Sequence, residues 1–230
     1  MKSPLVRLVP FALYAFACAR VFAALPIAET FDQKPAASLW SLSTQAKVLD
    51  GELVLAAAGP ADGYPTTGIT TKAGDPALNF LVKPIEIELS GIDVSGADVP
   101  ANSVFMAIIT SDFPNEMKAR SYLKLRLSGD GTLLLNCAEI GGDRTRETTL
   151  QTLKVKLPVR RLTLQISSNG FVLKGVDASR PFEQSAGWNE RLDLTAWKGA
   201  APFVIIKGVR RPGEGEAMVR LGEVTIREAK

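Results

Sequence analysis

Apolar and polar residues alternate along several short stretches of this chain, as they do in β-strands that bury one face and expose the other. In residues 122–127 three leucines alternate with a tyrosine, a lysine and an arginine. The same period of two recurs in residues 85–89 and 162–166. The pattern predicts antiparallel sheets with an apolar core on one side and water or a ligand on the other.

Other stretches extend this picture of a β-rich chain. Residues 104–109 and 203–206 are apolar at successive positions and predict central or covered strands. Residues 218–226 predict a final strand with a bulge at Gly222. Asx-Gly pairs between alternating runs suit tight hairpin turns, because both residues tolerate positive φ angles. The predicted hairpins join residues 46–49 to 52–55 through Asp50-Gly51, 122–127 to 132–137 through Asp130-Gly131, and 162–166 to 171–174 through Asn169-Gly170.

Helical signals are few. Asp193 can cap a single turn over residues 194–197, and residues 184–191 form a weak candidate for another turn. Many short strands with turn signals between them, and little helix, favour an all-β fold. We therefore predict a two-sheet antiparallel β-sandwich.

The first residues of the chain follow the pattern of a secretory signal peptide. Two basic residues flank the start of an apolar run at residues 8–19, and Val21-Phe22-Ala23 supplies compact residues before a cleavage site. The run is shorter than the roughly 20 residues that span a bilayer, so no transmembrane segment is predicted. We expect a signal peptide at residues 1–23, one domain at residues 24–230, and a secreted or periplasmic protein.

The two cysteines carry little further chemistry. Cys18 offers an alternative reading of the leader as a lipoprotein signal, but Ala15-Phe16-Ala17 before it differs from the Leu-Ala-Gly typical of that signal. Lipidation at Cys18 is therefore not favoured. Cys137 is the only cysteine after the leader, so the mature domain has no intrachain disulfide. Its strand places it on the same face as two leucines, and we expect a small buried residue.

Charge and composition exclude several classes of function. The full chain has 27 basic and 24 acidic residues, and three of the basic ones lie in the leader. The remaining domain is electrically balanced, so nothing favours nucleic acid or an anionic membrane as a partner. The chain has no histidine, which excludes Ser-His-Asp and Cys-His nucleophile systems and the HExxH zinc proteases.

Four local patterns occur in an order that points to one family of sandwiches. They are Glu29-Thr30-Phe31-Asp32 followed by Trp40, the hairpin at residues 47–55, the strand–Asp-Gly–strand unit at residues 121–133, and the closing pair at residues 192–197 and 221–226. This order resembles a concanavalin A-like jelly roll, the sandwich of laminin G domains and legume lectins. The resemblance implies that Trp40 and Trp197 lie in the core. It also implies glycan-related work, because this fold in secreted bacterial proteins often binds or cleaves polysaccharide.

The glycosidases of that family carry Glu-x-Asp-x-x-Glu, or the same motif one residue shorter, and neither form occurs in this chain. Glu86 and Glu88 come nearest, since they share a strand face roughly 7 Å apart, which is within the range of an inverting pair. Cross-strand pairing with Lys124 or Arg126 would explain the same glutamates without catalysis. We therefore favour a non-catalytic protein and keep Glu86 and Glu88 as weak catalytic candidates.

Binding of a sugar needs less than catalysis, namely a rigid polar sheet face and an aromatic platform. If the polar strands are neighbours, their side chains form one charged surface, and loop aromatics can stack on a sugar ring. Residues 58–67 and 111–121 form loops long enough to frame such a site. The candidate carbohydrate-binding residues are Tyr64, Glu86, Glu88, Tyr122, Lys124, Arg126, Asn136, Gln165 and Trp188, with Phe113 and Thr163 as further members of the same surface.

No metal site or other cofactor is predicted. Asp112, Asn115 and Glu116 offer oxygen ligands from one loop, but their spacing is not that of an EF-hand. Calcium at this loop remains an alternative.

The sequence thus favours an exported, non-catalytic, carbohydrate-binding β-sandwich of the bacterial cell envelope, with a polysaccharide or other glycan as its partner. One alternative is a glycoside hydrolase or related polysaccharide-active enzyme that uses Glu86 and Glu88. It requires a raised pKa on one of the two carboxyls. A second alternative is a structural or protein-interaction module of the laminin G type, whose partner is another envelope protein.

Overall fold

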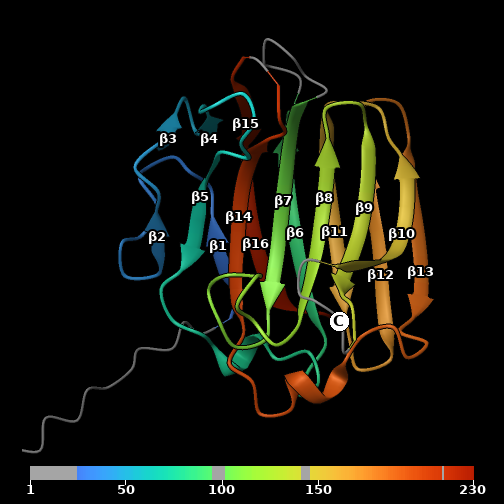
Figure 1. The fold of residues 1–230 in the computed structure, drawn as a ribbon. Helices are drawn as coiled ribbons and strands as arrows, with labels where there is room; N and C mark the ends of the chain where they lie inside the picture. Colours follow the sequence, from blue (N-terminus) through green and yellow to red (C-terminus); the bar gives the residue numbers. More distant parts are fainter. Residues whose placement is uncertain (1–24, 95–101, 141–145, 214) are drawn as a thin grey trace, which may run out of the picture.

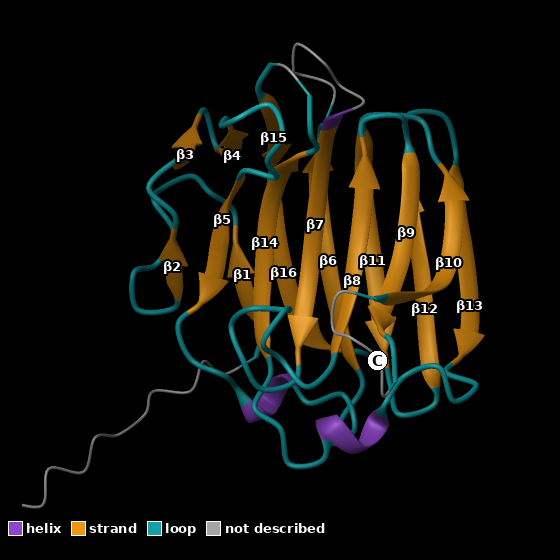
Figure 2. Cartoon of the chain, in the orientation of Figure 1, coloured by secondary structure: helices purple, strands orange, loops and turns teal. Residues whose placement is uncertain are grey.

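The computed structural model describes residues 25–94, 102–140, 146–213 and 215–230, so the predicted signal peptide lies outside the described residues. Two large antiparallel sheets face each other, and a small third sheet lies at the upper left of the view (Figure 1). Short 3-10 turns, η1 (Pro76–Leu78) and η3 (Leu194–Trp197), lie below the sheets (Figure 2). The predicted all-β sandwich is confirmed.

The strands are ordered as follows within the three sheets. The six-stranded sheet runs β1 (Ile27–Glu29), β16 (Glu223–Glu228), β6 (Ile85–Ile92), β11 (Val159–Ile166), β12 (Gly170–Val176), β13 (Pro181–Gly187). The seven-stranded sheet runs β10 (Glu147–Lys154), β9 (Thr132–Ala138), β8 (Tyr122–Ser128), β7 (Ser103–Thr110), β14 (Phe203–Arg210), β5 (Thr66–Thr71), β2 (Trp40–Leu42). The small sheet runs β15 (Ala217–Leu221), β4 (Glu52–Ala57), β3 (Ala46–Leu49).

The core lies between the two large sheets and is built from the apolar faces that the alternation predicts. The leucines of β8 and the aliphatic residues of β6 all belong to it. Trp40 and Trp197 are fully buried, which confirms their predicted position. Phe80 packs on Trp197 with 4.7 Å between the ring centroids. In the described part of the chain no helix is long and apolar enough to cross a membrane.

Cys137 is buried in this core, as predicted. Its thiol donates to the carbonyl oxygen of Arg191 at 3.1 Å, which satisfies its one weak donor. Burial raises the pKa of the thiol to about 11. Cys137 therefore contributes packing and not reactivity.

All three predicted hairpins are present, between β3 and β4, β8 and β9, and β11 and β12. Asp50 and Gly51 both take positive φ, at 53° and 77°, as a two-residue hairpin turn requires. Gly131 takes positive φ at the second hairpin, also at 77°. At the third, Gly170 is already the first residue of β12, so the turn is made by the residues before it.

Two predicted elements are wrong. Residues 218–226 do not form one strand, because β15 pairs with β4 in the small sheet while β16 pairs with β6 in the six-stranded sheet. Gly222 is the point at which the chain passes from one sheet to the other. Residues 184–191 are not helical: residues 184–187 belong to β13 at the edge of the six-stranded sheet, and residues 188–191 form a turn in which the Arg191 amide donates to the Trp188 carbonyl oxygen at 2.9 Å.

Candidate functional site

The predicted binding residues divide between the outer faces of the two large sheets. Glu86 and Glu88 lie on β6 in the six-stranded sheet, and Gln165 on β11 is the cross-strand partner of Glu86. The seven-stranded sheet carries Tyr122, Lys124, Arg126 and Asn136. The expectation of one shared surface is wrong, because strand alternation shows which residues share a face but not which sheet the strand joins.

On the seven-stranded sheet, a carboxylate that the sequence did not single out connects the predicted residues. Glu147 on β10 accepts a hydrogen bond from Tyr122 Oη at 3.1 Å and one from Asn136 Nδ2 at 2.7 Å. It also forms an ion pair with Lys124. We call these four residues the Glu147 cluster. Glu147 was missed because residues 147–154 lack a regular apolar alternation, and so β10 was not predicted.

The Glu147 cluster is held by complementary charge. Burial alone would raise the pKa of Glu147, but Lys124 and the hydrogen bonds from Asn136 and Tyr122 outweigh it and hold the pKa below the ordinary value. Burial and the Glu147 carboxylate raise the pKa of Tyr122 well above its usual range. The Lys124 ammonium also lies 5.4 Å from the centroid of the Tyr122 ring. The cluster is therefore a neutral phenol beside a fixed ion pair.

The loop at residues 111–121 folds across this face. Figure 1 shows it in front of β14 and β7, near their lower ends. Glu116 in this loop forms an ion pair with Lys207 of β14, and the Lys207 charge outweighs burial to lower the pKa of Glu116. Tyr122, Lys124 and Asn136 are almost fully buried. They form a rigid floor, whereas we had expected them to face solvent.

The same loop holds the residues of the calcium alternative, and each has another partner. Asp112 accepts from Arg120 Nε at 2.7 Å, and the Asn115 side chain accepts from the Met117 amide at 2.9 Å. Glu116 is paired with Lys207, as above. Among the described residues no group of three or more His, Cys, Asp or Glu side chains is arranged to hold a metal ion.

Accessible groups lie around the floor. Tyr64, on the loop at residues 58–65, is 66% exposed, and Phe113 on the opposite loop is 44% exposed. Arg126 lies on β8 toward the Tyr64 end and is half-buried. Beside Lys207 is a hollow of about 250 Å³ whose lining includes Ser43, which follows β2, and threonines of β5.

On the outer face of the six-stranded sheet, Glu86 and Glu88 have ion-pair partners that account for their presence without a catalytic role. Arg227 of β16 forms ion pairs with both carboxylates, and Gln165 donates to Glu86 at 2.5 Å. Burial would raise the pKa of Glu86, but Gln165 and Arg227 outweigh it and lower the pKa. The raised pKa that a general acid needs is absent at Glu86, and the partner is Arg227, not the predicted Lys124 or Arg126.

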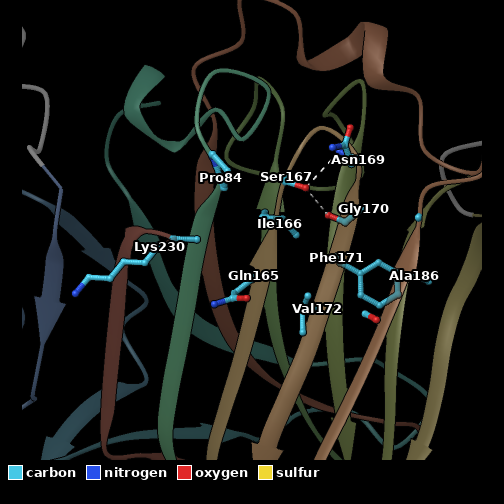
Figure 3. A pocket seen from close by; sticks show the side chains of 13 residues that line it. Pro84, Gln165, Ile166, Ser167, Asn169, Gly170, Phe171, Val172, Ala186 and Lys230 are labelled. Atoms are coloured by element: carbon cyan, nitrogen blue, oxygen red, sulfur yellow. Dashed lines mark hydrogen bonds between the residues drawn. The ribbon is translucent and has the colours of Figure 1, made fainter.

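Two hollows lie along this second face. One of about 360 Å³ is lined by Glu86, Glu88 and charged residues of the neighbouring strands. The other, of about 400 Å³, lies at the hairpin between β11 and β12, where Gln165 and Val172 face it (Figure 3). In the first hollow Glu86, Glu88 and Arg227 already pair with one another across strands.

Trp188 is not a surface platform, contrary to our expectation. It is buried, and its ring packs against Phe80 and Phe171 at centroid distances of 5.9 and 5.7 Å. Its indole Nε1 donates to the Ser167 carbonyl oxygen at 2.9 Å. A single aromatic residue after a strand is compatible with either position, and only packing decides between them.

Known structures align with the chain along most of its length. A structure reported with endo-acting O-glycanases, which members of the human gut microbiota express to initiate mucin breakdown, aligns with a TM-score of 0.61 at 13% identity, over 89% of this chain and 99% of that chain. The Bacillus licheniformis β-glucanase aligns at 0.54 and 10% identity, over 89% and 98%. The Ca²⁺/Man3GlcNAc-bound exoplasmic/lumenal domain of VIP36 aligns at 0.56 and 9% identity, over 84% of each chain.

The chain has the fold of the concanavalin A-like jelly rolls. No protein-family model matches it and no curated protein matches it in sequence, so the jelly roll is recognised through its strands and their order.

In this jelly roll the seven-stranded face is suited to holding a ligand in place. Its floor is fixed by internal hydrogen bonds, and its accessible groups are aromatic, hydroxyl and guanidinium. The carboxylates Glu116 and Glu147 have lowered pKa values and ammonium partners, so both are ionised at neutral pH and neither is a proton donor there.

Proposed function

We propose that this protein is an exported, non-catalytic, carbohydrate-binding jelly roll of the bacterial cell envelope, and that its glycan lies across the outer face of the seven-stranded sheet. The observation that carries the proposal is the Glu147 cluster, a rigid polar floor, on the same sheet whose β5 follows the loop with the exposed ring of Tyr64. Such a floor loses little conformational entropy when a ligand binds. An exposed ring supplies the apolar contact that a sugar face needs.

The solved structures support the same proposal. Those of similar fold include a β-glucanase and a domain bound to Man3GlcNAc. The ion-paired, low-pKa carboxylates on both faces favour the non-catalytic form over the hydrolase alternative. Export rests on residues 1–23, whose pattern is that of a signal peptide.

A glycan array tests the proposal, with the chain from residue 24, which retains every described strand. We expect binding to one class of glycan, with and without EDTA. Tyr64→Ala should weaken it about tenfold, equivalent to roughly 1.4 kcal/mol. Glu88→Gln, on the opposite face, is the control and should leave affinity within twofold.

Each other outcome points elsewhere. Release of shorter oligosaccharides from a bound glycan would establish the hydrolase alternative. If the folded protein bound no glycan on a broad array, the proposal would be overturned in favour of the protein-interaction module. Loss of binding in EDTA would establish the calcium alternative. Cell fractionation tests export, and protein found only in the cytoplasm would contradict it. N-terminal sequencing of the exported protein tests the leader, and an intact residue 1 would contradict its cleavage.

A further inference from the structure

Arg126 is the one predicted residue of the seven-stranded face whose charge is unmatched in the described structure. No described residue forms a hydrogen bond or ion pair with its guanidinium group, and its Nε atom is buried without a partner. Its cross-strand neighbours are Met106 on β7 and Leu134 on β9, which are apolar. A half-buried guanidinium between apolar neighbours has lost much of its hydration without receiving a protein acceptor in return.

The nearby carboxylates are committed to other donors. Glu147 is held by the residues of its own cluster, and Glu116 by Lys207. Asp130, at the turn after β8, accepts from the Thr132 amide at 3.0 Å and pairs with Lys154. None of these three is available to Arg126 without breaking an existing ion pair.

A second guanidinium is brought to the same end of the face. Arg211 Nη2 donates to Ser128 Oγ at 3.0 Å, and Ser128 follows Arg126 by two residues on the same face of β8. Positions two apart on a strand are separated by about 7 Å, so the two cations are neighbours. Burial and the Arg211 charge both lower the pKa of Arg126, as expected for adjacent like charges.

The loops around this pair are fixed in place. The buried Arg210 donates to the carbonyl oxygens of Gly59 at 3.0 Å and Gly215 at 2.9 Å, which ties the loop that carries Tyr64 to the segment that carries Arg211. The Gly213 amide also donates to the Ala61 carbonyl oxygen at 2.7 Å. The site is therefore organised before any ligand arrives.

We propose that Arg126 and Arg211 bind the anionic group, carboxylate or sulfate, of an acidic polysaccharide, with Tyr64 beside them. The inference rests on the proposed function and names the class of glycan. An oxyanion would supply the acceptor that Arg126 lacks, and a guanidinium can engage it through two parallel hydrogen bonds. A neutral sugar would leave two like charges adjacent and unpaired, so this end of the face selects against it.

Isothermal titration calorimetry with defined polysaccharides tests the inference. The probes are alginate and polygalacturonate for carboxylate, dextran sulfate for sulfate, and laminarin, mannan and dextran as neutral glycans. We expect one acidic class to bind, and its identity distinguishes the two anionic groups. Arg126→Met keeps the apolar stem and should lower that affinity about tenfold or more, as should Arg211→Met.

Controls separate the site from general charge and from folding. Arg160→Met removes one positive charge from an exposed position on the other sheet and should change affinity less than twofold. Arg126→Lys keeps the charge but loses the planar fork and should recover only part of the binding. Unfolding midpoints of all variants identify any that fail to fold, and Arg211→Met, in a loop outside the strands, is the second test.

The outcomes are distinct for the two proposals. Binding of a neutral glycan that is unaffected by Arg126→Met and Arg211→Met would overturn the inference and leave the proposed function standing. Binding of no polysaccharide by the folded protein would overturn both. If Arg160→Met lowered the affinity for the acidic polysaccharide as much as Arg126→Met does, the effect would be one of general charge, and the inference would be overturned. Binding of double-stranded DNA as tight as that of the polysaccharide would lead to the same conclusion.

Discussion

Glu147 is the side chain on which the polar floor of the seven-stranded face depends. It accepts from Tyr122 and Asn136 and pairs with Lys124, whose side chain is only 11% exposed. Removing one member of such a pair leaves the other charge buried without compensation, which costs more than the pair itself contributes. The floor is therefore sensitive to loss of a charge on this one residue.

Glu147→Gln keeps the shape of the side chain and removes its charge, so it should lower the free energy of unfolding by about 2–4 kcal/mol at pH 7. The folded pKa of Glu147 lies below the ordinary value of a glutamate, so the stabilisation is present above that ordinary value and is lost as pH falls through the folded pKa. The gap between wild type and variant should therefore close in acid. Urea unfolding from pH 7 down to pH 3 measures it, and a gap of constant size would contradict the prediction.

At the residue scale, the alternation in the sequence predicted which face of a strand a side chain lies on, but it did not predict the side chain's interaction partners. Cys137, Trp40 and Trp197 are buried as predicted, because apolar neighbours in the same strand or motif determine their environment. The cationic partners predicted for Glu86 were wrong, and Trp188 was predicted to be exposed although it is buried. Both depend on which strands meet in space, and that information is not local.

Two turn glycines with the same φ angle show what an element requires of glycine. Gly51 and Gly131 both have a φ angle of 77°. A Cβ atom at Gly51 would find Asp32 Oδ1 as its nearest neighbour, at 3.8 Å. A Cβ atom at Gly131 would lie 2.3 Å from the Val155 carbonyl oxygen, because the chain after β10 crosses that turn. An alanine at position 51 would therefore meet backbone strain alone, whereas an alanine at position 131 would meet both strain and a steric clash.

Gly51→Ala should therefore lower the free energy of unfolding by about 1–2 kcal/mol, the cost of a left-handed conformation for an L-residue. Gly131→Ala has that cost and a clash with backbone, and should lose about 1–3 kcal/mol more. Chemical denaturation of both variants under one set of conditions measures the difference. Equal losses would show that the segment at Val155 moves aside freely.

Strands with a regular period or an Asx-Gly turn could be predicted at this scale, and the others could not. β8, β9, β11 and β12 follow their predicted bounds within a few residues. β10 and β13 lie at the sheet edges, where fewer positions are buried and the alternation is weak. The break between β15 and β16 was read as a bulge because a glycine in a strand fits either reading.

At the scale of the whole molecule, the sandwich separates two polar faces by its core. The alternation and the order of motifs predicted the jelly roll, since both are properties of the entire chain. The sequence could predict the residues of the site but not their arrangement, and the sheet order places these residues on two separate sheets. Stacked sheets lie about 10 Å apart, so groups on opposite outer faces cannot contact one ligand unit.

The sheet order also makes the last strand essential. β16 pairs with both β1 and β6, and its Val224 and Ile226 are fully buried. A chain that ends at Gly222 should lose the cooperative urea transition and the near-ultraviolet circular dichroism of the native protein, because β1 loses its partner and the core is opened. A chain that ends at Glu228 retains the strand and is the matched control. A cooperative transition at the same midpoint in both would contradict the prediction.

In each large sheet, a strand near the end of the chain, which leaves the ribosome late, lies between two strands that are made earlier. β14 inserts between β7 and β5, and β16 between β1 and β6. At about 5–20 residues per second, synthesis holds the earlier strands for seconds or longer before their neighbours emerge. During that interval they remain open at the positions that β14 and β16 will fill. Under the proposed export this delay is an advantage, because a folded sandwich could not pass through a narrow membrane pore.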